Sequence, residues 1–152
     1  MRKLLAVLLA ICAVVAVPAL AASSKYKATL NGKSEAPQKT NSPATGSATF
    51  TIAANGKSIS YTLKASKLTG PAQAAHIHFG KVGKAGPVII AICAKPCSLP
   101  KSGKLTSKQF AKAPGVANFA AAVKAIKSGK AYVNIHTKKH PAGEIRGQIK
   151  KG

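Results

Sequence analysis

The sequence predicts an all-β protein, an antiparallel Greek-key β-sandwich or barrel that carries one short helix. Short stretches of alternating apolar and polar residues recur along the chain, and clusters of Gly, Pro, Ser and Asn separate them. Two of these stretches flank an Asn-Gly dipeptide, which is a strong indication of a β-hairpin. Only one stretch has the periodicity of a helix. About seven short strands at regular spacing are typical of sandwiches and barrels.

The chain begins with a segment that we expect to be removed. Two basic residues follow the first methionine, Leu4–Val17 is an uncharged apolar run, and Ala19-Leu20-Ala21 has the small-x-small pattern of a cleavage site. The run is shorter than the ~20 residues of a membrane span, so an uncleaved anchor is the weaker alternative. We expect residues 1–21 to be a signal peptide. Residues 22–152 would then be one secreted or extracytoplasmic domain, not integral to the membrane after cleavage.

Three alternating stretches make up the first part of this domain. They are residues 25–30, 46–54 and 57–64, and the last two lie on either side of Asn55-Gly56. Successive side chains of a strand point to opposite faces, so this alternation predicts strands with one buried face. We expect the second and third stretches to form a hairpin.

The middle of the domain contains two more expected strands and a polar segment. Residues 72–79 form the first strand, and the apolar run 88–92 is short enough to be a buried strand. Residues 94–115 are rich in Lys, Pro, Ser and Gly, which predicts an ordered but exposed excursion.

The last part of the domain supplies the helix and the final strands. Three apolar residues of segment 117–128 fall on one helical face, and Gly129 would end the helix. Strands are expected at 131–137 and 144–150, joined by a turn.

Cys93 and Cys97 are the two cysteines beyond residue 21. In an oxidising compartment a lone close pair favours a disulfide, and two free thiols or a metal clip are the alternatives. The closed loop would be short, so the bond would fix a local turn more than it would stabilise the fold.

The expected domain is strongly basic. It keeps 22 of the 24 basic residues and both acidic ones, which gives a net charge of +20. Such a charge attracts polyanions without specificity. Every base except Arg146 is a lysine, which lacks the forked geometry favoured for reading phosphates and bases. We therefore expect no specific nucleic-acid partner.

Four histidines are the candidate metal ligands: His76, His78, His136 and His140. His76 and His78 point to the same face of their expected strand, because side chains in a strand repeat every two residues. Such a pair can offer two imidazoles to one copper or zinc ion. Three or four imidazoles would converge if strands 72–79 and 131–137 are neighbours.

Glu35 and Glu144 are the only acids, and Arg146 lies two residues after Glu144. A surface this rich in lysine has no general need for acids, so each is expected to have a partner. Two interpretations remain open for these residues. They form a polar cluster that supports the histidines at a binding site, or they form a buried hydrogen-bond network with a structural role.

Several motifs closely resemble those of the CHRD (chordin) domain family. They are AHIHFG at 75–80, GPV at 86–88, AYVNIHT at 131–137 and PAGEIRGQ at 141–148, with LNGKSEAP at 30–37 upstream. The resemblance covers about residues 25–150 and implies an immunoglobulin-like β-barrel of the type found in secreted chordin and in stand-alone exported bacterial proteins. The short cysteine insert, the many lysines and a single proline at Pro37 depart from the family pattern, and these departures concern the surface.

We expect a non-catalytic binding or structural module whose partner is an unknown extracellular ligand or envelope component. No nucleophile elbow and no phosphate-binding loop is present in the sequence. The alternative is a copper- or zinc-binding protein that uses the His-x-His cluster on a sandwich like that of superoxide dismutase. Dismutase activity itself is disfavoured, because the chain has no aspartate for the zinc site. A glycosidase with Glu35 and Glu144 as acid and base is disfavoured by the absence of Trp to stack sugars.

Overall fold

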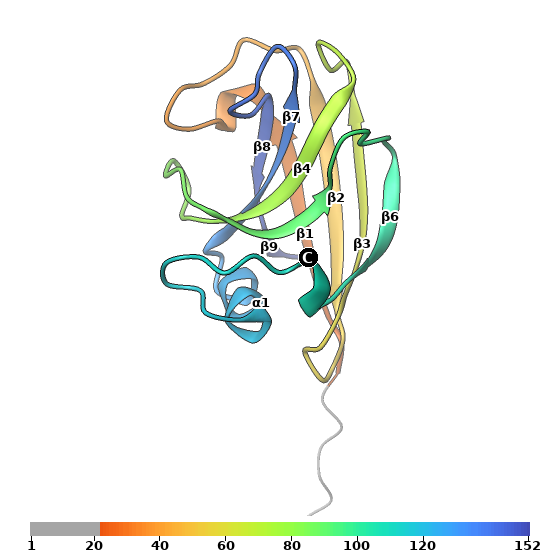
Figure 1. Cartoon of the computed structure of the whole chain (residues 1–152), viewed down its shortest axis with the longest axis vertical. Coiled ribbons are helices and arrows are strands. Elements are labelled where there is room, and N and C mark those ends of the chain that lie inside the picture. Colours follow the sequence, from red (N-terminus) through yellow and green to blue (C-terminus); the bar gives the residue numbers. More distant parts are fainter. Residues whose placement is uncertain (1–21) are drawn as a thin grey trace, which may run out of the picture.

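A computed structural model describes residues 22–152, so the predicted signal peptide at 1–21 lies outside the described residues. The described chain forms one antiparallel sheet of nine strands with a single α-helix (Figure 1). The strands are β1 (Ser24–Asn31), β2 (Thr45–Ile52), β3 (Ile59–Ser66), β4 (Ala72–Phe79), β5 (Val88–Cys93), β6 (Lys101–Leu105), β7 (Ala131–Thr137), β8 (Ile145–Gln148) and β9 (Lys150–Lys151). The helices are α1 (Phe119–Lys127) and the 3-10 turns η1 (Gly32–Ser34) and η2 (Ser107–Gln109).

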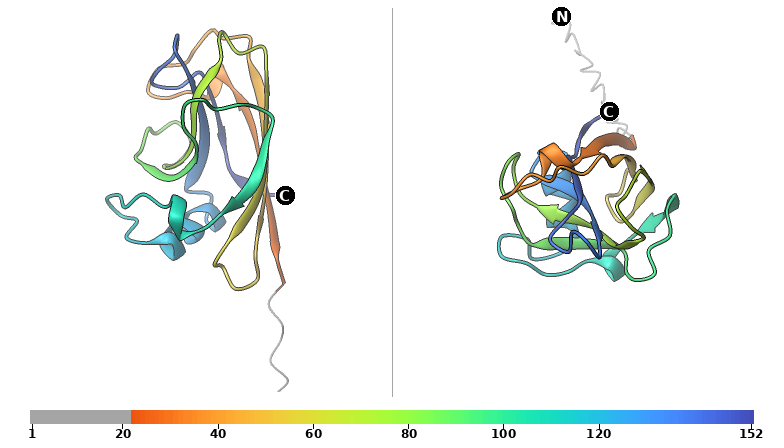
Figure 2. Two further views of the ribbon diagram at one scale, coloured as in Figure 1. Left: turned by 45° about the vertical axis from the view of Figure 1, so that its right-hand side comes forward. Right: turned by 90° about the horizontal axis from the view of Figure 1, so that it is seen from above.

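The sheet curls into a nearly closed barrel. Its strand order is β5-β4-β7-β8-β1-β2-β3-β6, and β9 pairs with β1. The two edge strands, β5 and β6, are consecutive in the chain, so the segment between them crosses the seam that the barrel leaves open. Seen from above, the strands surround a central core (Figure 2). The predicted all-β fold with one short helix is confirmed.

The predicted hairpin is also confirmed. β2 and β3 pair along their whole length, from Thr45 opposite Ser66 to Ile52 opposite Ile59. Gly56 in the turn has φ +67°, a conformation that glycine adopts without a Cβ clash. The prediction of an exposed excursion at 94–115 was incomplete, because the segment contains β6. Only Leu105 of this edge strand is buried, so the sequence lacks the alternation that would have revealed it.

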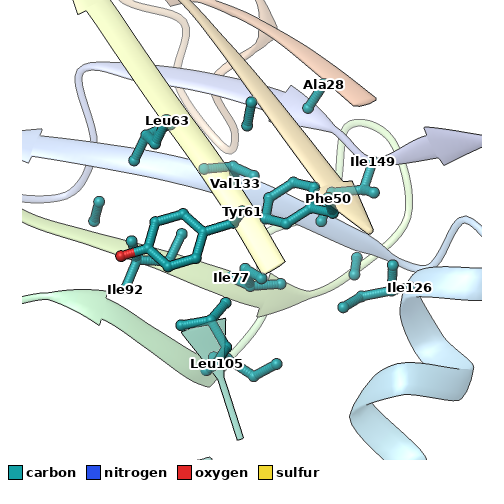
Figure 3. Close-up of a cluster of buried hydrophobic side chains, with 14 of the residues drawn as sticks. Ala28, Phe50, Tyr61, Leu63, Ile77, Ile92, Leu105, Ile126, Val133 and Ile149 are labelled. Carbon is teal, nitrogen blue, oxygen red and sulfur yellow. The ribbon is translucent and has the colours of Figure 1, made fainter. Parts of the chain in front are cut away.

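The core lies inside the barrel and is made of the inward-facing apolar residues of every long strand. Phe50, Ile77 and Val133 meet there, and Ile126 of α1 reaches the same cluster (Figure 3). Asn118 caps α1, because its side-chain oxygen accepts a hydrogen bond from the backbone N–H of Ala121. No helix among the described residues is long and apolar enough to cross a membrane.

Two further features concern the cysteines and the charge. Cys93 and Cys97 are bonded through their sulfur atoms, as predicted, with their Cα atoms 5.4 Å apart. Every lysine in residues 22–152 is exposed except Lys101, which is half-buried. Arg146, in contrast, is buried with an exposed fraction of 1%.

β7 is buried along nearly its whole length, on both of its faces. Its inner face packs on the core. Two loops contact its outer face: residues 80–87, which connect β4 to β5, through Gly86 and Tyr132, and residues 32–44, which connect β1 to β2, through Glu35 and Asn134. Under these loops lies a row of polar side chains from β4, β7 and β8. This covered outer face carries the candidate site.

Candidate metal centre

Three histidines come together on the outer face of β4 and β7. The strands are antiparallel neighbours, with His76 opposite Asn134 and Ala74 opposite His136. Residues directly opposite each other point to the same face, so His76, His78 and His136 share the outer face. One nitrogen from each of the three rings lies within 4.8 Å of the others. The fourth candidate, His140, lies in the turn after β7 and is not part of this group.

The tautomers of two of these rings are determined by backbone carbonyl groups. Nδ1–H of His78 donates to the carbonyl of Gly86 at 2.9 Å, and Nδ1–H of His136 donates to the carbonyl of Pro141 at 3.0 Å. Each ring therefore keeps an unprotonated Nε2. Metal-binding histidines in proteins almost always donate their other ring nitrogen in this way.

The unprotonated nitrogens face the third ring or remain without a partner. Nε2 of His136 accepts a hydrogen bond from Nδ1 of His76 at 3.3 Å. Nε2 of His78 is buried and has no hydrogen-bond partner. A buried acceptor without a partner is costly, so an occupant that accepts its lone pair would stabilise this arrangement.

The three imidazoles are neutral at neutral pH. Burial lowers the pKa of His78 to about 4, with smaller contributions from His136 and His76. Burial also lowers the pKa of His76, assisted by His136, and lowers the pKa of His136 against the opposing hydrogen bond to Pro141. Neutral imidazole is the form that binds metal ions.

A stack of planar groups supports His78. The ring of Tyr132 lies parallel to the His78 ring with centroids 4.9 Å apart, and the guanidinium of Arg146 lies 3.4 Å above the centroid of Tyr132. Nη2 of Arg146 donates to the carbonyls of Lys81 and Lys84, so the same arginine holds the covering loop.

The covering loop approaches β4 closely at Gly86. A Cβ at this position would overlap the carbonyl of Phe79, and only glycine avoids this contact. The hydroxyl of Tyr132 accepts a hydrogen bond from the Gly86 N–H at 3.1 Å. These contacts hold the Gly86 carbonyl in place for His78.

Both carboxylate oxygens of Glu144 are occupied by hydrogen bonds, and none of these bonds comes from Arg146. Oε1 accepts from the Ser42 hydroxyl and the Thr69 N–H, and Oε2 accepts from the hydroxyls of Thr69 and Thr137. Burial opposes ionisation of this carboxyl, but the hydrogen bonds outweigh it and lower the pKa of Glu144. Its contacts join three segments of the chain, which is a structural role.

Glu35 has a different environment on the same outer face. Its Oε2 accepts from the side-chain amide of Asn134 at 3.1 Å, whereas Oε1 is buried without a partner. Burial raises the pKa of Glu35 to about 7, against smaller effects of Asn134 and Arg146. The predicted polar cluster of Glu35, Glu144 and Arg146 is therefore divided. Glu35 contacts Asn134 and Arg146 contacts Tyr132, both on β7 beside the histidines, whereas Glu144 binds the loops through Ser42 and Thr69.

Residues 26–149 match the sequence model of the CHRD domain family. The chain belongs to the CHRD domain family. No curated protein and no solved structure matches this CHRD domain. The motifs of the sequence resemblance all fall on the outer-face site or its covering loops: HIH on β4, GPV at Gly86, YVNIHT on β7 and GEIRGQ on β8.

Sequence reasoning did not identify Tyr132, Asn134 and Gln148 as members of this site. Each lies an even number of residues from His136 or Arg146 on its own strand, so the period of two was available as an indication. The neighbouring order β4-β7-β8, which brings them beside His78, comes only from the tertiary fold.

Proposed function

We propose that this CHRD domain is an extracytoplasmic binding module whose ligand is a copper or zinc ion, held by His76, His78 and His136. The observation that carries the proposal is the convergence of three ring nitrogens within 4.8 Å of one another. The two carbonyl hydrogen bonds that leave Nε2 of His78 and His136 unprotonated support it.

The donor set favours particular metals. Neutral imidazoles suit zinc and copper, and the order of divalent affinities places copper(II) above zinc. In the metal-free chain the Nδ1–H of His76 donates to His136, so binding of a metal ion through this nitrogen requires a change of tautomer in which Nε2 of His76 carries the proton. Three ligands leave a further coordination position for water or an external group.

Binding rather than catalysis is part of the proposal. Glu144, one of the two acids, is occupied by four hydrogen bonds, which supports a structural rather than an acid–base role. Export is proposed from the leader pattern of residues 1–21, and the cysteine pair is consistent with an oxidising compartment.

The test is metal analysis and titration of the mature protein purified without a histidine tag. We expect one copper or zinc ion per chain. The variants His76→Ala and His136→Ala should each lower metal affinity more than about 100-fold, because loss of even an outer hydrogen-bond partner costs 10–100-fold. His140→Ala is the matched control, since it removes a histidine outside the group and should leave affinity unchanged.

A purely structural role of the histidines predicts a different result. His78→Ala would then destabilise the protein to the same extent with and without metal ions. Under the proposal, added copper or zinc raises the unfolding temperature of the wild-type protein and of His140→Ala, but not that of His76→Ala. Absence of stoichiometric binding by the wild-type protein would refute the proposal.

A further inference from the structure

A pocket lined by several charged and polar residues lies on the outer face beside the candidate metal centre. It has a volume of about 460 Å³ and is formed by β1, β8, β9, η1 and the loop at 82–83. None of the three clustered histidines lines it. Its volume is in the range of small-molecule sites in proteins.

The pocket contains the sole arginine of the described chain. Nη2 of Arg146 is occupied by the carbonyls of Lys81 and Lys84, which fix the guanidinium in position. Nη1 is buried and has no hydrogen-bond partner. A guanidinium held in place with unused N–H groups is suited to bind a carboxylate or another oxyanion.

Two residues that line the same pocket, Glu35 and Gln148, each have one buried oxygen without a hydrogen-bond partner. Oε1 of Glu35 accepts no hydrogen bond. Nε2 of Gln148 donates to the carbonyls of Gly80 and Gly129, so its amide orientation is fixed and Oε1 is the atom left without a partner. The oxygen of Gln148, and that of Glu35 in its ionised form, require donors such as hydroxyl groups.

Four exposed lysines surround the opening. Lys27 and Lys150 lie directly opposite each other on β1 and β9, and Lys33 and Lys39 come from the η1 segment and the loop after it. Like charges directly opposite each other are unfavourable, so an anion between Lys27 and Lys150 would relieve their repulsion.

We propose that this pocket binds a hydroxylated carboxylate, the chemistry of a sugar-acid unit. The carboxylate is placed at Arg146 and the lysines, and hydroxyl groups donate to Glu35 and Gln148. A bare inorganic anion would leave both acceptors without donors, and a neutral sugar would leave the guanidinium and the lysines without an anion. The pocket has no aromatic side chain for stacking, so charge and hydrogen bonds provide the recognition.

The proposal does not depend on the histidine site, and its test uses metal-free protein. The experiment is calorimetric titration of the mature chain with sodium D-glucuronate at near-physiological salt, with D-glucose and sodium sulfate as comparison ligands. Glucuronate should bind saturably at one site, glucose should give no binding, and sulfate should bind at least about tenfold more weakly, because it satisfies only the cationic part of the pocket. Trigalacturonate distinguishes the sources: tighter binding than glucuronate indicates a polysaccharide, and equal binding indicates a free acid.

Matched lysine variants separate a built pocket from general attraction to a basic surface. Lys27→Ala combined with Lys150→Ala should weaken glucuronate binding about tenfold, because two charged contacts are lost. Lys57→Ala combined with Lys104→Ala removes the same charge outside the pocket and should change affinity less than about twofold. Equal weakening by the two double variants, or no binding of glucuronate and trigalacturonate by the wild-type protein, would overturn the proposal.

An NMR map of the glucuronate complex gives an independent readout that needs no variant. Backbone shifts should concentrate at Gly83, Glu35 and Gln148. Shifts spread over exposed lysines all around the barrel would contradict a single site.

Discussion

The two glutamates of this domain are both buried, but they differ in the number of hydrogen bonds that they accept and in the direction of their pKa shifts. Glu144 has an exposed fraction of 0% and accepts four hydrogen bonds. Glu35 has an exposed fraction of 6% and accepts one side-chain hydrogen bond, and one of its oxygens has none. The pKa of Glu144 is lowered and that of Glu35 is raised to about 7.

This difference distinguishes a region whose buried polar groups all have hydrogen-bond partners from one in which several do not. A carboxylate whose acceptors are filled by its own chain contributes to stability and needs no ligand. Five buried side-chain atoms of the described residues lack hydrogen-bond partners, and all belong to residues of the covered outer face: Glu35, His78, Asn134, Arg146 and Gln148. Perturbed pKa values and unsatisfied groups gathered in one place are typical of binding sites.

The largest effect is expected from removing the complete network. Glu144→Ala leaves one backbone N–H and three hydroxyl groups without their acceptor, so the free energy of unfolding should fall by about 3–5 kcal/mol. Urea denaturation at neutral pH measures the change. Glu144→Gln keeps one acceptor oxygen and should cost less than Glu144→Ala; equal losses would mean that the carboxylate charge, not the hydrogen bonds, is what matters.

A smaller effect of opposite sign is expected at Glu35. Its folded-state pKa of about 7 exceeds the ordinary 4.5, so the folded protein holds the proton more tightly and the unfolding free energy falls as pH rises between these two values. Glu35→Gln removes this loss. The variant should be more stable than the wild type by about 1–3 kcal/mol near pH 8, and the difference should close toward pH 4.5.

Titration of the histidines does not affect the difference in stability between the wild type and Glu35→Gln. Their lowered pKa values destabilise the folded state as pH falls below their ordinary value of 6.5, but they do so equally in both proteins. The difference between the two denaturation curves therefore reports Glu35 alone. A constant difference at all pH values would show that Glu35 is not protonated in the folded state near neutrality.

The smallest effect is expected from removing a single donor to the complete network. Ser42→Ala should lower the unfolding free energy by about 1 kcal/mol at pH 7, because the other three hydrogen bonds to Glu144 remain. The stabilisation of a carboxylate with a lowered pKa is lost as pH falls through that pKa, so the cost should shrink in strongly acidic solution, below the ordinary pKa of 4.5. Thermal unfolding under the neutral and the acidic condition checks this, and a cost that grows on acidification would contradict it.

Much of the fold was predictable because local patterns determined it. The strands at 72–79 and 131–137 coincide with β4 and β7, and the Asn55-Gly56 turn joins β2 to β3 as expected. β6 was missed, because an edge strand with one buried side chain needs no apolar alternation. The expected strand 144–150 is divided into β8 and β9, and the residue between them, Ile149, still donates its N–H to the carbonyl of Ala131 in register with the pairing of β7 and β8.

The candidate site was predictable only in part. The His-x-His spacing predicted that His76 and His78 share one face of a strand. The position of His136 beside them depends on the order of the strands in the sheet, which local sequence patterns do not contain. The division between the two acids was not predictable either. Glu144 meets Ser42 and Thr69 over 102 and 75 residues of chain, and such long-range contacts leave no periodic trace in the sequence.

The separation of lysine from arginine has a practical consequence. The exposed cations of the described domain are primary amines, while its one guanidinium is enclosed beneath a loop. Amine-directed acetylation therefore erases the positive exterior, and reductive methylation of the same groups preserves it, while neither reagent reacts with Arg146. Comparing the acetylated and the methylated protein would therefore show how much of any binding depends on the positive charge of the surface lysines and how much depends on the folded domain itself.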